Sequence, residues 1–176
     1  PAALCWLYGQ YMEGYLHDLD ACQRFALRSR ERIMTEILLR TGLDASSVFH
    51  TIHNYIDVDE RILRKGAIAA HAGEKVLIPL NMRDGSILAK GKGNVEWNYS
   101  APHGAGRAMS RKRARETLDM DAYRKTMAGV YSTSICVSTL DEAPDAYKPI
   151  EDIIDSISET VDIIDVMKPI YNFKVS

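Results

Sequence analysis

The apolar residues of this chain change their spacing near position 48, and this change determines the fold class. From about Gly14 to Arg40 they recur every three or four residues, as in an amphipathic helix that Gly42 ends. We expect that helix to pack on the core. From 48 to 100, short β-branched and apolar runs alternate with turn residues, which predicts a sheet. Together they predict an α+β fold with a mixed or antiparallel sheet core and flanking helices.

Turn residues divide the rest of the chain into shorter elements. After a loop over 44–47, strands are expected over 48–53, 62–69, 76–79, 86–90, 97–100, 132–138 and 170–174. Three further helices are expected: one past Arg111, one from near 119–121 to about Met127, and an amphipathic one over 150–164 that Lys168-Pro169 ends.

Composition favours a soluble chain with a core of its own. Of its 176 residues, 46% are hydrophobic, and no apolar stretch reaches membrane-spanning length. No signal-like start is visible, so we expect a cytoplasmic protein without a membrane partner. Cys5, Cys22 and Cys136 are odd in number and lack C-x-x-C spacing, so we expect buried free thiols rather than disulfides or a zinc site.

The formal net charge of −2 is the balance of two segments of opposite sign. Residues 101–125 hold seven Arg or Lys against three acids, whereas 141–165 hold nine acids against one Lys. A nucleic-acid partner would contact the first segment and avoid the second. Alternatively, both segments are solvated helix faces.

The stretch 100–111 carries the clearest chemical signal. It places His103 beside a Gly-Ala-Gly turn and ahead of two arginines, Arg107 and Arg111. A neutral imidazole is a nucleophile, and glycines let backbone N–H groups approach an anion. If a helix begins near Gly106, both guanidiniums and the helix N-terminus face the same phosphate. The alternative is a glycine turn with a structural histidine.

Two other segments offer polar groups at expected strand ends. His53-Asn54 closes one expected strand, where His53 is either a metal ligand or a neutral histidine bonded to backbone. The loop over 79–86 joins two expected strands, and its Asn81, Arg83 and Ser86 can hydrogen-bond a ligand. Asp84-Gly85 is also sufficient for a simple hairpin turn.

Taken together, these segments resemble the C-terminal portion of the RtcB family of RNA-splicing ligases. The likeness covers nearly the whole chain. It is carried, in family order, by His53-Asn54, Arg64-Lys65-Gly66-Ala67, 79–86, Gly91-Lys92-Gly93-Asn94, 101–107, Met109-Ser110-Arg111, Asp141-Glu142-Ala143-Pro144, Ala146-Tyr147-Lys148 and Lys174.

The resemblance implies a GTP- and Mn²⁺-dependent ligase. Such enzymes join an RNA 3′-phosphate or 2′,3′-cyclic phosphate end to a 5′-hydroxyl end through a histidine-linked GMP, in tRNA splicing or RNA repair. By motif match, His103 would be the guanylylated nucleophile and His53 a manganese ligand. Nucleotide contacts would come from Asn54, Pro79, Leu80, Asn81, Met82, Ser86, Gly104, Ala105, Gly106, Arg111 and Lys174.

The chain departs from the family in what precedes these motifs. The family's bridging cysteine, two further metal-binding histidines and another nucleotide-binding stretch lie upstream of the region matched here. The chain starts with Pro1, so we expect a fragment in which 1–176 form the C-terminal part of a single catalytic domain. Alone, it should bind manganese weakly and seal no RNA.

Two alternatives to the ligase stay open. One is a noncatalytic nucleotide- or RNA-binding module on the same scaffold, favoured by the basic segment after His103. The other is a phosphotransferase with a phosphohistidine intermediate. The sequence identifies neither the natural RNA nor an activating protein partner.

Overall fold

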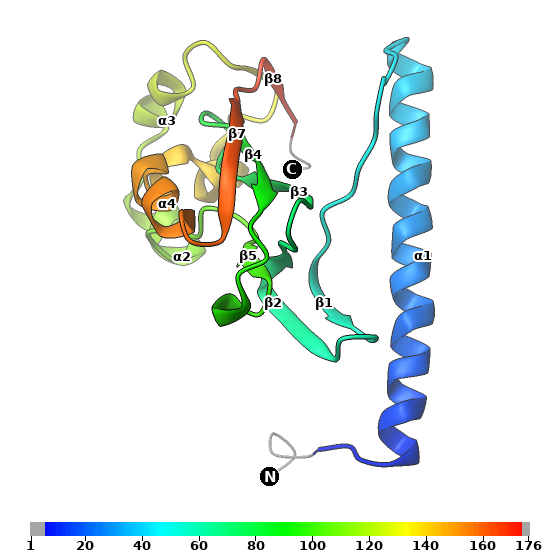
Figure 1. Ribbon diagram of the computed structural model, residues 1–176. Helices are drawn as coiled ribbons and strands as arrows, with labels where there is room; N and C mark the ends of the chain where they lie inside the picture. Colours follow the sequence, from blue (N-terminus) through cyan, green and yellow to red (C-terminus); the bar gives the residue numbers. More distant parts are fainter. Residues whose placement is uncertain (1–5, 174–176) are drawn as a thin grey trace. The chain divides into compact units, whose positions relative to one another are not determined.

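A computed structural model describes residues 6–173 (Figure 1). The chain divides into two compact units. The first comprises residues up to Phe49 together with Tyr55–Leu63, and the second comprises His50–Asn54 and the residues from Arg64 onward. Across 6–173, no helix is both long and apolar enough to cross a membrane.

One long helix dominates the first unit. Helix α1 (Gln10–Thr41) ends at Gly42, whose φ of 69° is left-handed and whose N–H donates to the Leu38 carbonyl. The predicted helix is therefore confirmed, with three or four more residues at its start. Ion pairs one turn apart, such as Arg24 with Asp20, stabilise its polar side.

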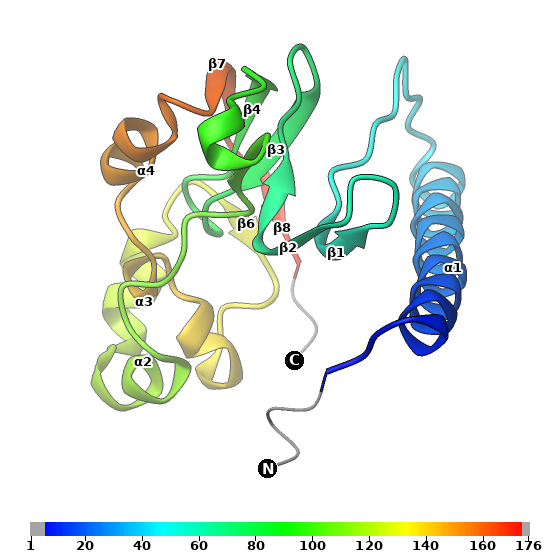
Figure 2. The ribbon, with the colours of Figure 1, turned by 60° about the horizontal axis from the view of Figure 1, so that its bottom comes forward.

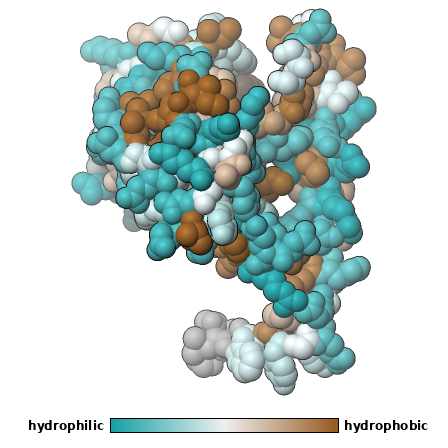
Figure 3. Space-filling view, viewed as in Figure 1, coloured by the Kyte–Doolittle hydropathy of each residue, from teal (hydrophilic) through white to brown (hydrophobic). Residues whose placement is uncertain are grey.

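The expectation that this helix packs on the core is wrong. None of the residues of α1, all of which the structure describes, is buried, and the side chain of Phe25 is 76% exposed. Apolar side chains are visible at the surface in Figure 3. Helical spacing produces an apolar stripe, but spacing alone does not specify what covers that stripe.

Three small sheets organise the strands. The first has the order β1-β2-β5, and the second, antiparallel throughout, has the order β3-β4-β7; a parallel pair, β6-β8, forms the third. The strands are β1 (His53–Asp57), β2 (Ile62–Ala69), β3 (Lys75–Pro79), β4 (Ser86–Gly91), β5 (Ser100–Pro102), β6 (Tyr131–Ser132), β7 (Val161–Met167) and β8 (Tyr171–Asn172). The α+β class with mostly antiparallel sheets is confirmed.

Among the described residues, the second unit has three short α-helices: α2 (Arg111–Thr117), α3 (Met120–Thr126) and α4 (Ile150–Ile157). The side chains of Ser110 and Asp119 cap α2 and α3 by accepting backbone N–H groups of the first turn. The starts of all three helices agree with the sequence pattern.

The core of the second unit has two parts. In one, Ile78 and Ile87 of the β3–β4 pair pack with Ile157 of α4, all three fully buried. In the other, Tyr123 and Met127 of the α3 region pack against Met82 of the β3–β4 loop. This loop is thus held between the two parts of the core, and it is one wall of the site described below.

Several expected elements have other structures. The segment 48–52 is not a strand, because the Thr51 hydroxyl accepts the Leu77 N–H in place of a backbone partner. The segment 95–97 is a 3₁₀ turn capped by Asn94, and β5 starts only at Ser100. Tyr99 before it has a left-handed φ of 50°, which breaks an extended run.

The expected helix over 150–164 is two elements. Helix α4 ends after Ile157, where the Thr160 N–H and hydroxyl both donate to the Ile157 carbonyl. The β-branched residues that follow form β7, which pairs with β4 from Val161 onward. Of the expected strand 132–138, only Ser132 is in a strand, and a 3₁₀ helix (Val137–Glu142) begins within the segment.

The expectation of buried thiols is also wrong where it can be checked. Cys22 is exposed on α1, a helix in which no residue is buried. Cys136 is half-buried in a polar turn, where its thiol contacts the hydroxyls of Ser138 and Thr139. Cys5 lies outside the described residues.

Candidate nucleotide-binding site

His103 directly follows β5 and is held by the neighbouring strand. Its backbone N–H donates to the Gly66 carbonyl of β2 at 3.3 Å. The Gly66 N–H in turn donates to the side-chain oxygen of Asn54 at 2.8 Å. The bond from His103 to Gly66 continues the antiparallel register of β2 and β5 by one pair, and the side chain of Asn54 extends it into an Asn54–Gly66–His103 connection. It brings the two predicted segments, 53–54 and 100–111, to one place.

The His103 imidazole is half-buried, and its ring centroid lies 5.2 Å from that of His53, with the ring planes tilted by 59°. Burial, and secondly the charge that His53 can carry, lower the pKa of His103 from its ordinary value of 6.5. At neutral pH the ring is therefore predominantly uncharged, which is the form with a lone pair for attack.

The glycine segment after His103 fits tightly against β3. The Ala105 N–H donates to the Pro79 carbonyl at 3.0 Å, and a Cβ on Gly104 would stand 3.1 Å from that same oxygen. Gly106 has a left-handed φ of 69°. A side chain on Gly104 would force the segment away from β3, so glycine keeps the backbone close to the strand end.

The predicted polar loop forms the facing wall. Leu80 N–H donates to the Gly85 carbonyl, and Asn81 organises the turn, its side-chain oxygen accepting the N–H groups of Arg83 and Asp84. Gly85 has a φ of 83°, and a Cβ there would lie 2.0 Å from the Met167 carbonyl of β7. The loop is therefore a hairpin turn and a cavity wall at once.

Between these walls lies an open cavity of about 740 Å³. It contains His103, all five predicted residues of the 79–86 loop, the three residues of the glycine segment and Arg111. Its lining is Pro79, Leu80, Asn81, Met82, Gly85, Ser86, His103, Gly104, Ala105, Gly106, Arg107, Arg111, Glu142, Tyr147, Met167, Lys168, Pro169, Asn172 and Phe173.

Three predicted residues stand apart from this lining. His53 lies beside the His103 ring and Asn54 binds the Gly66 N–H, but neither lines the cavity, and both are exposed. The side-chain oxygen of Asn54 accepts a hydrogen bond from the backbone N–H of Gly66. Lys174 lies outside the described residues.

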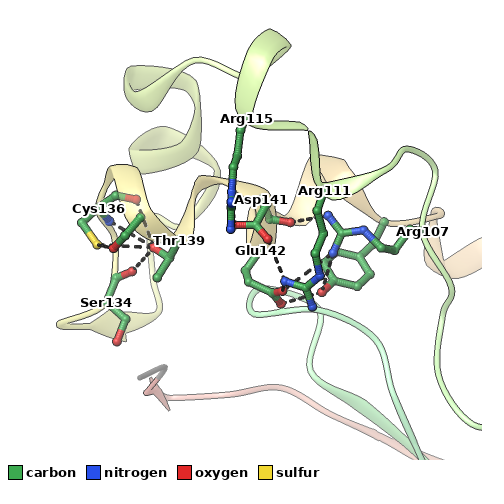
Figure 4. Close-up of polar contacts among 10 residues, drawn as sticks. Arg107, Arg111, Arg115, Ser134, Cys136, Thr139, Asp141 and Glu142 are labelled. Carbon is green, nitrogen blue, oxygen red and sulfur yellow. Dashed lines mark hydrogen bonds and ion pairs between the residues drawn. The ribbon is translucent and has the colours of Figure 1, made fainter. Parts of the chain in front are cut away.

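A cluster of arginines and carboxylates closes the cavity on the side of α2 (Figure 4). Arg111 donates to Asp141 at 2.7 Å and to Glu142 at 2.6 Å, and Arg115 donates to Asp141 at 3.1 Å. Asp141 is buried, which by itself would raise its pKa, but hydrogen bonds from Arg111 and Arg115 hold that pKa below its ordinary value.

The expected pairing of Arg107 and Arg111 on one helix is wrong. Helix α2 begins at Arg111, so Arg107 precedes it. The Arg107 guanidinium lies over the Tyr147 ring, 4.9 Å from its centroid, and donates to the carbonyls of Met109 and Asp141. Arg107 thus fixes the chain around the site, while Arg111 is partly exposed at the cavity.

Tyr147 is the aromatic wall of the cavity. Its hydroxyl donates to Glu142 at 2.6 Å. Burial, and then the hydrogen bond to Glu142, raise the pKa of Tyr147 to about 12. The phenol therefore stays protonated and neutral at physiological pH.

The sequence around this cavity matches a single family along nearly the whole chain. The family model described as "tRNA-splicing ligase RtcB" matches residues 3–175. The chain belongs to the RtcB family.

Relatives in this family are similar over most of the chain. RNA-splicing ligase RtcB of Escherichia coli K12 is 28% identical over 180 residues, which cover 92% of this chain and 43% of that protein. tRNA-splicing ligase RtcB of Aeropyrum pernix is 32% identical, with 79% of this chain and 36% of the relative covered. This chain thus spans less than half the length of these RtcB proteins.

The described residues hold no complete metal site. The imidazoles of His53 and His103 lie near each other, but within residues 6–173 no group of three His, Cys, Asp or Glu side chains is placed to hold an ion. The described residues therefore do not make up a manganese site by themselves.

Five cavity residues have no role that the sequence predicts: Glu142, Tyr147, Lys168, Asn172 and Phe173. The sequence gives little signal for the last three because β7 and β8 bring them to the cavity, and the positions of these strands depend on pairing with distant strands.

Proposed function

We propose that this chain forms the nucleotide-binding part of a GTP- and Mn²⁺-dependent RNA ligase. The enzyme would join RNA 3′-phosphate or 2′,3′-cyclic phosphate ends to 5′-hydroxyl ends, with His103 as the residue that carries GMP. One observation supports this most directly: the imidazole of His103, whose pKa is lowered by burial, lies at a cavity of about 740 Å³ between the glycine segment and the 79–86 loop. Membership of the RtcB family supplies the reaction class.

In the first step, the lone pair of His103 attacks the α-phosphorus of GTP. A P–N bond forms, the bond to the β-phosphate oxygen breaks, and pyrophosphate leaves. The Asn54–Gly66–His103 connection fixes the backbone that carries the ring. Close packing of Gly104 against β3 keeps the backbone after His103 at the cavity wall, where its polar groups face a phosphate.

In the following steps, an RNA 3′-phosphate oxygen attacks the same phosphorus and takes the GMP, and the P–N bond breaks. The RNA 5′-hydroxyl then attacks the activated 3′-phosphate and releases GMP. Three guanidiniums meet two carboxylates here, because Arg107 lies near Glu142 while Arg111 and Arg115 donate to Asp141, so this cluster keeps a net positive charge for the phosphates.

Manganese, when bound, would neutralise phosphate oxygens and stabilise the pyrophosphate that leaves. His53 would be one of its ligands, and because no group of three His, Cys, Asp or Glu side chains within residues 6–173 is placed to hold an ion, its further ligands would come from elsewhere.

The test uses the protein as its gene encodes it, incubated with Mn²⁺ and GTP labelled at the α-phosphate. The label should attach covalently to the protein and be lost in His103→Ala. The matched control is His17→Ala, which changes an exposed imidazole on α1 and should keep the label. Label that persists in His103→Ala would refute the proposal, and attachment from γ-labelled GTP instead would indicate a phosphohistidine enzyme.

A noncatalytic nucleotide- or RNA-binding module is the second candidate. It is favoured by the pairing of Arg111 with two protein carboxylates, which leaves this guanidinium less free for a transferring phosphate. Binding of GTP without covalent label in either protein would support this candidate over the ligase.

A further inference from the structure

Two tyrosines stack on each other beside the cavity. Tyr131 of β6 and Tyr171 of β8 have ring centroids 5.7 Å apart and ring planes 24° apart. Both residues stay open to solvent, at 67% and 51% exposure. Parallel pairing of β6 with β8 sets them directly opposite each other, and the Tyr131 N–H donates to the Ile170 carbonyl at 3.1 Å. The pair is therefore fixed by backbone, while the outer faces of its rings remain accessible.

Strand β8, which lies beside β6 (Figure 2), also carries residues that line the cavity. Asn172, next to Tyr171, lines the cavity, and its side-chain nitrogen donates to the Met82 carbonyl of the opposite wall at 3.5 Å. Phe173 lines the cavity as well, and its side chain is 63% exposed. Neither tyrosine belongs to the lining, so the pair lies just beyond the rim.

We propose that Tyr131 and Tyr171 form a stacking platform for an unpaired base of an RNA strand whose end enters the cavity. The inference rests on the proposed function, because it assumes that an RNA end must reach His103. A planar π-face accepts any base, and rigid aromatic rings lose little conformational freedom when a base stacks on them.

An RNA strand fits the position of the platform better than a single nucleotide does. The cavity already has its own aromatic wall, Tyr147, and the platform lies outside the lining. A ligand must extend beyond the rim to contact both. Lys168, which lines the cavity three residues before Tyr171, adds positive charge on this side for the phosphate that joins the two nucleotides.

The test measures binding of the 176-residue chain to a fluorescent single-stranded RNA with a 3′-phosphate, by anisotropy at low salt. Tyr131→Ala and Tyr171→Ala should each weaken binding roughly 5- to 100-fold, which corresponds to the loss of one stacked base. Tyr131→Phe and Tyr171→Phe keep the ring and should bind within about twofold of the unchanged chain. GTP binding should be the same in all five proteins.

Equal RNA affinity of the alanine variants and the unchanged chain would overturn the proposal, as would the absence of RNA binding by the unchanged chain. Self-association that only the alanine variants lose, without an effect on RNA, would assign the pair to an interface between copies and also overturn it. The measurement needs no guanylylation, so a failure of His103 to carry GMP and a failure of the platform give different results.

Discussion

At His103, chemistry depends on which form of the ring is present. Burial and the neighbouring His53 both favour the uncharged form, and no nearby carboxylate is needed to remove a proton. The backbone of the same residue is fixed by the bond from its N–H to the Gly66 carbonyl. Position and protonation are thus set by separate groups.

This predicts the pH dependence of covalent labelling by GTP. Because the pKa of His103 is lowered from 6.5, the rate should fall as the ring becomes protonated, and the midpoint of that fall should lie below pH 6.5. Initial rates of label incorporation between pH 5 and 8 check this. Noncovalent binding of GTP, measured at each pH, is the control for a loss of nucleotide affinity. A decline that is already half complete above pH 7 would contradict the lowered pKa.

The buried carboxylate of Asp141 gives a second prediction at the residue scale. Asp141→Asn should lower the free energy of unfolding by about 1–3 kcal/mol, because Arg111 and Arg115 lose a buried partner but are themselves partly hydrated. In Asp121→Asn, where the pair with Arg124 is exposed on both sides, the change should stay within about 0.5 kcal/mol. Urea unfolding of both variants measures the difference.

The sign of the pH dependence follows from the lowered pKa of Asp141. Its contribution to stability is complete above the unfolded-state pKa of about 3.9 and is lost as the pH falls through the lower folded-state value. The unchanged chain should therefore lose more stability between pH 5 and 3 than Asp141→Asn does. Equal slopes would show that the ion pair does not stabilise the fold.

At the scale of elements, the sequence predicted what local patterns specify. The strands at 62–69, 76–79 and 86–90 were placed within one residue, because alternating apolar residues and the turn at Gly85 determine them locally. The division of 150–164 into α4 and β7 was missed, because Val161 and the residues after it pair with β4, about seventy positions earlier. Isoleucine and valine fit either element, and only the distant partner decides between them.

This division is testable with two isoleucines. Ile157 is fully buried at the end of α4, so Ile157→Ala should lower the free energy of unfolding by about 2–5 kcal/mol, because a cavity remains in the core. Ile164 is 54% exposed in β7, so Ile164→Ala should lower it by about 1 kcal/mol or less. One continuous helix would put both residues on the same apolar face, and similar losses on thermal unfolding would favour that helix over the turn at Thr160.

At the scale of the whole molecule, motif reasoning found most of the cavity but not its electrostatics. Ten of the predicted residues line it, since the glycine segment and the 79–86 loop meet through the bond of Ala105 to Pro79. The pairing of Arg111 with Asp141 was not predictable, because thirty residues separate them and no spacing rule connects them. The exposure of the apolar residues of α1 was not predictable either, because helical periodicity identifies an apolar face but not what packs against it.

A prediction at this scale concerns sealing by the 176 residues alone. They should join no RNA 3′-phosphate end to a 5′-hydroxyl end in the presence of Mn²⁺ and GTP, because within residues 6–173 His53 has too few further donors beside it to complete a metal site. RNA-splicing ligase RtcB of E. coli serves as the positive control in the same gel assay. Ligation at a comparable rate by this chain would show that the described residues already suffice.

The most direct test of the central claim is to locate the attached GMP by tandem mass spectrometry of the gene-encoded protein after incubation with Mn²⁺ and GTP. The account predicts one modified peptide, with GMP on the imidazole of His103. GMP found on a lysine or on another histidine, or no modified peptide although GTP binds, would contradict it.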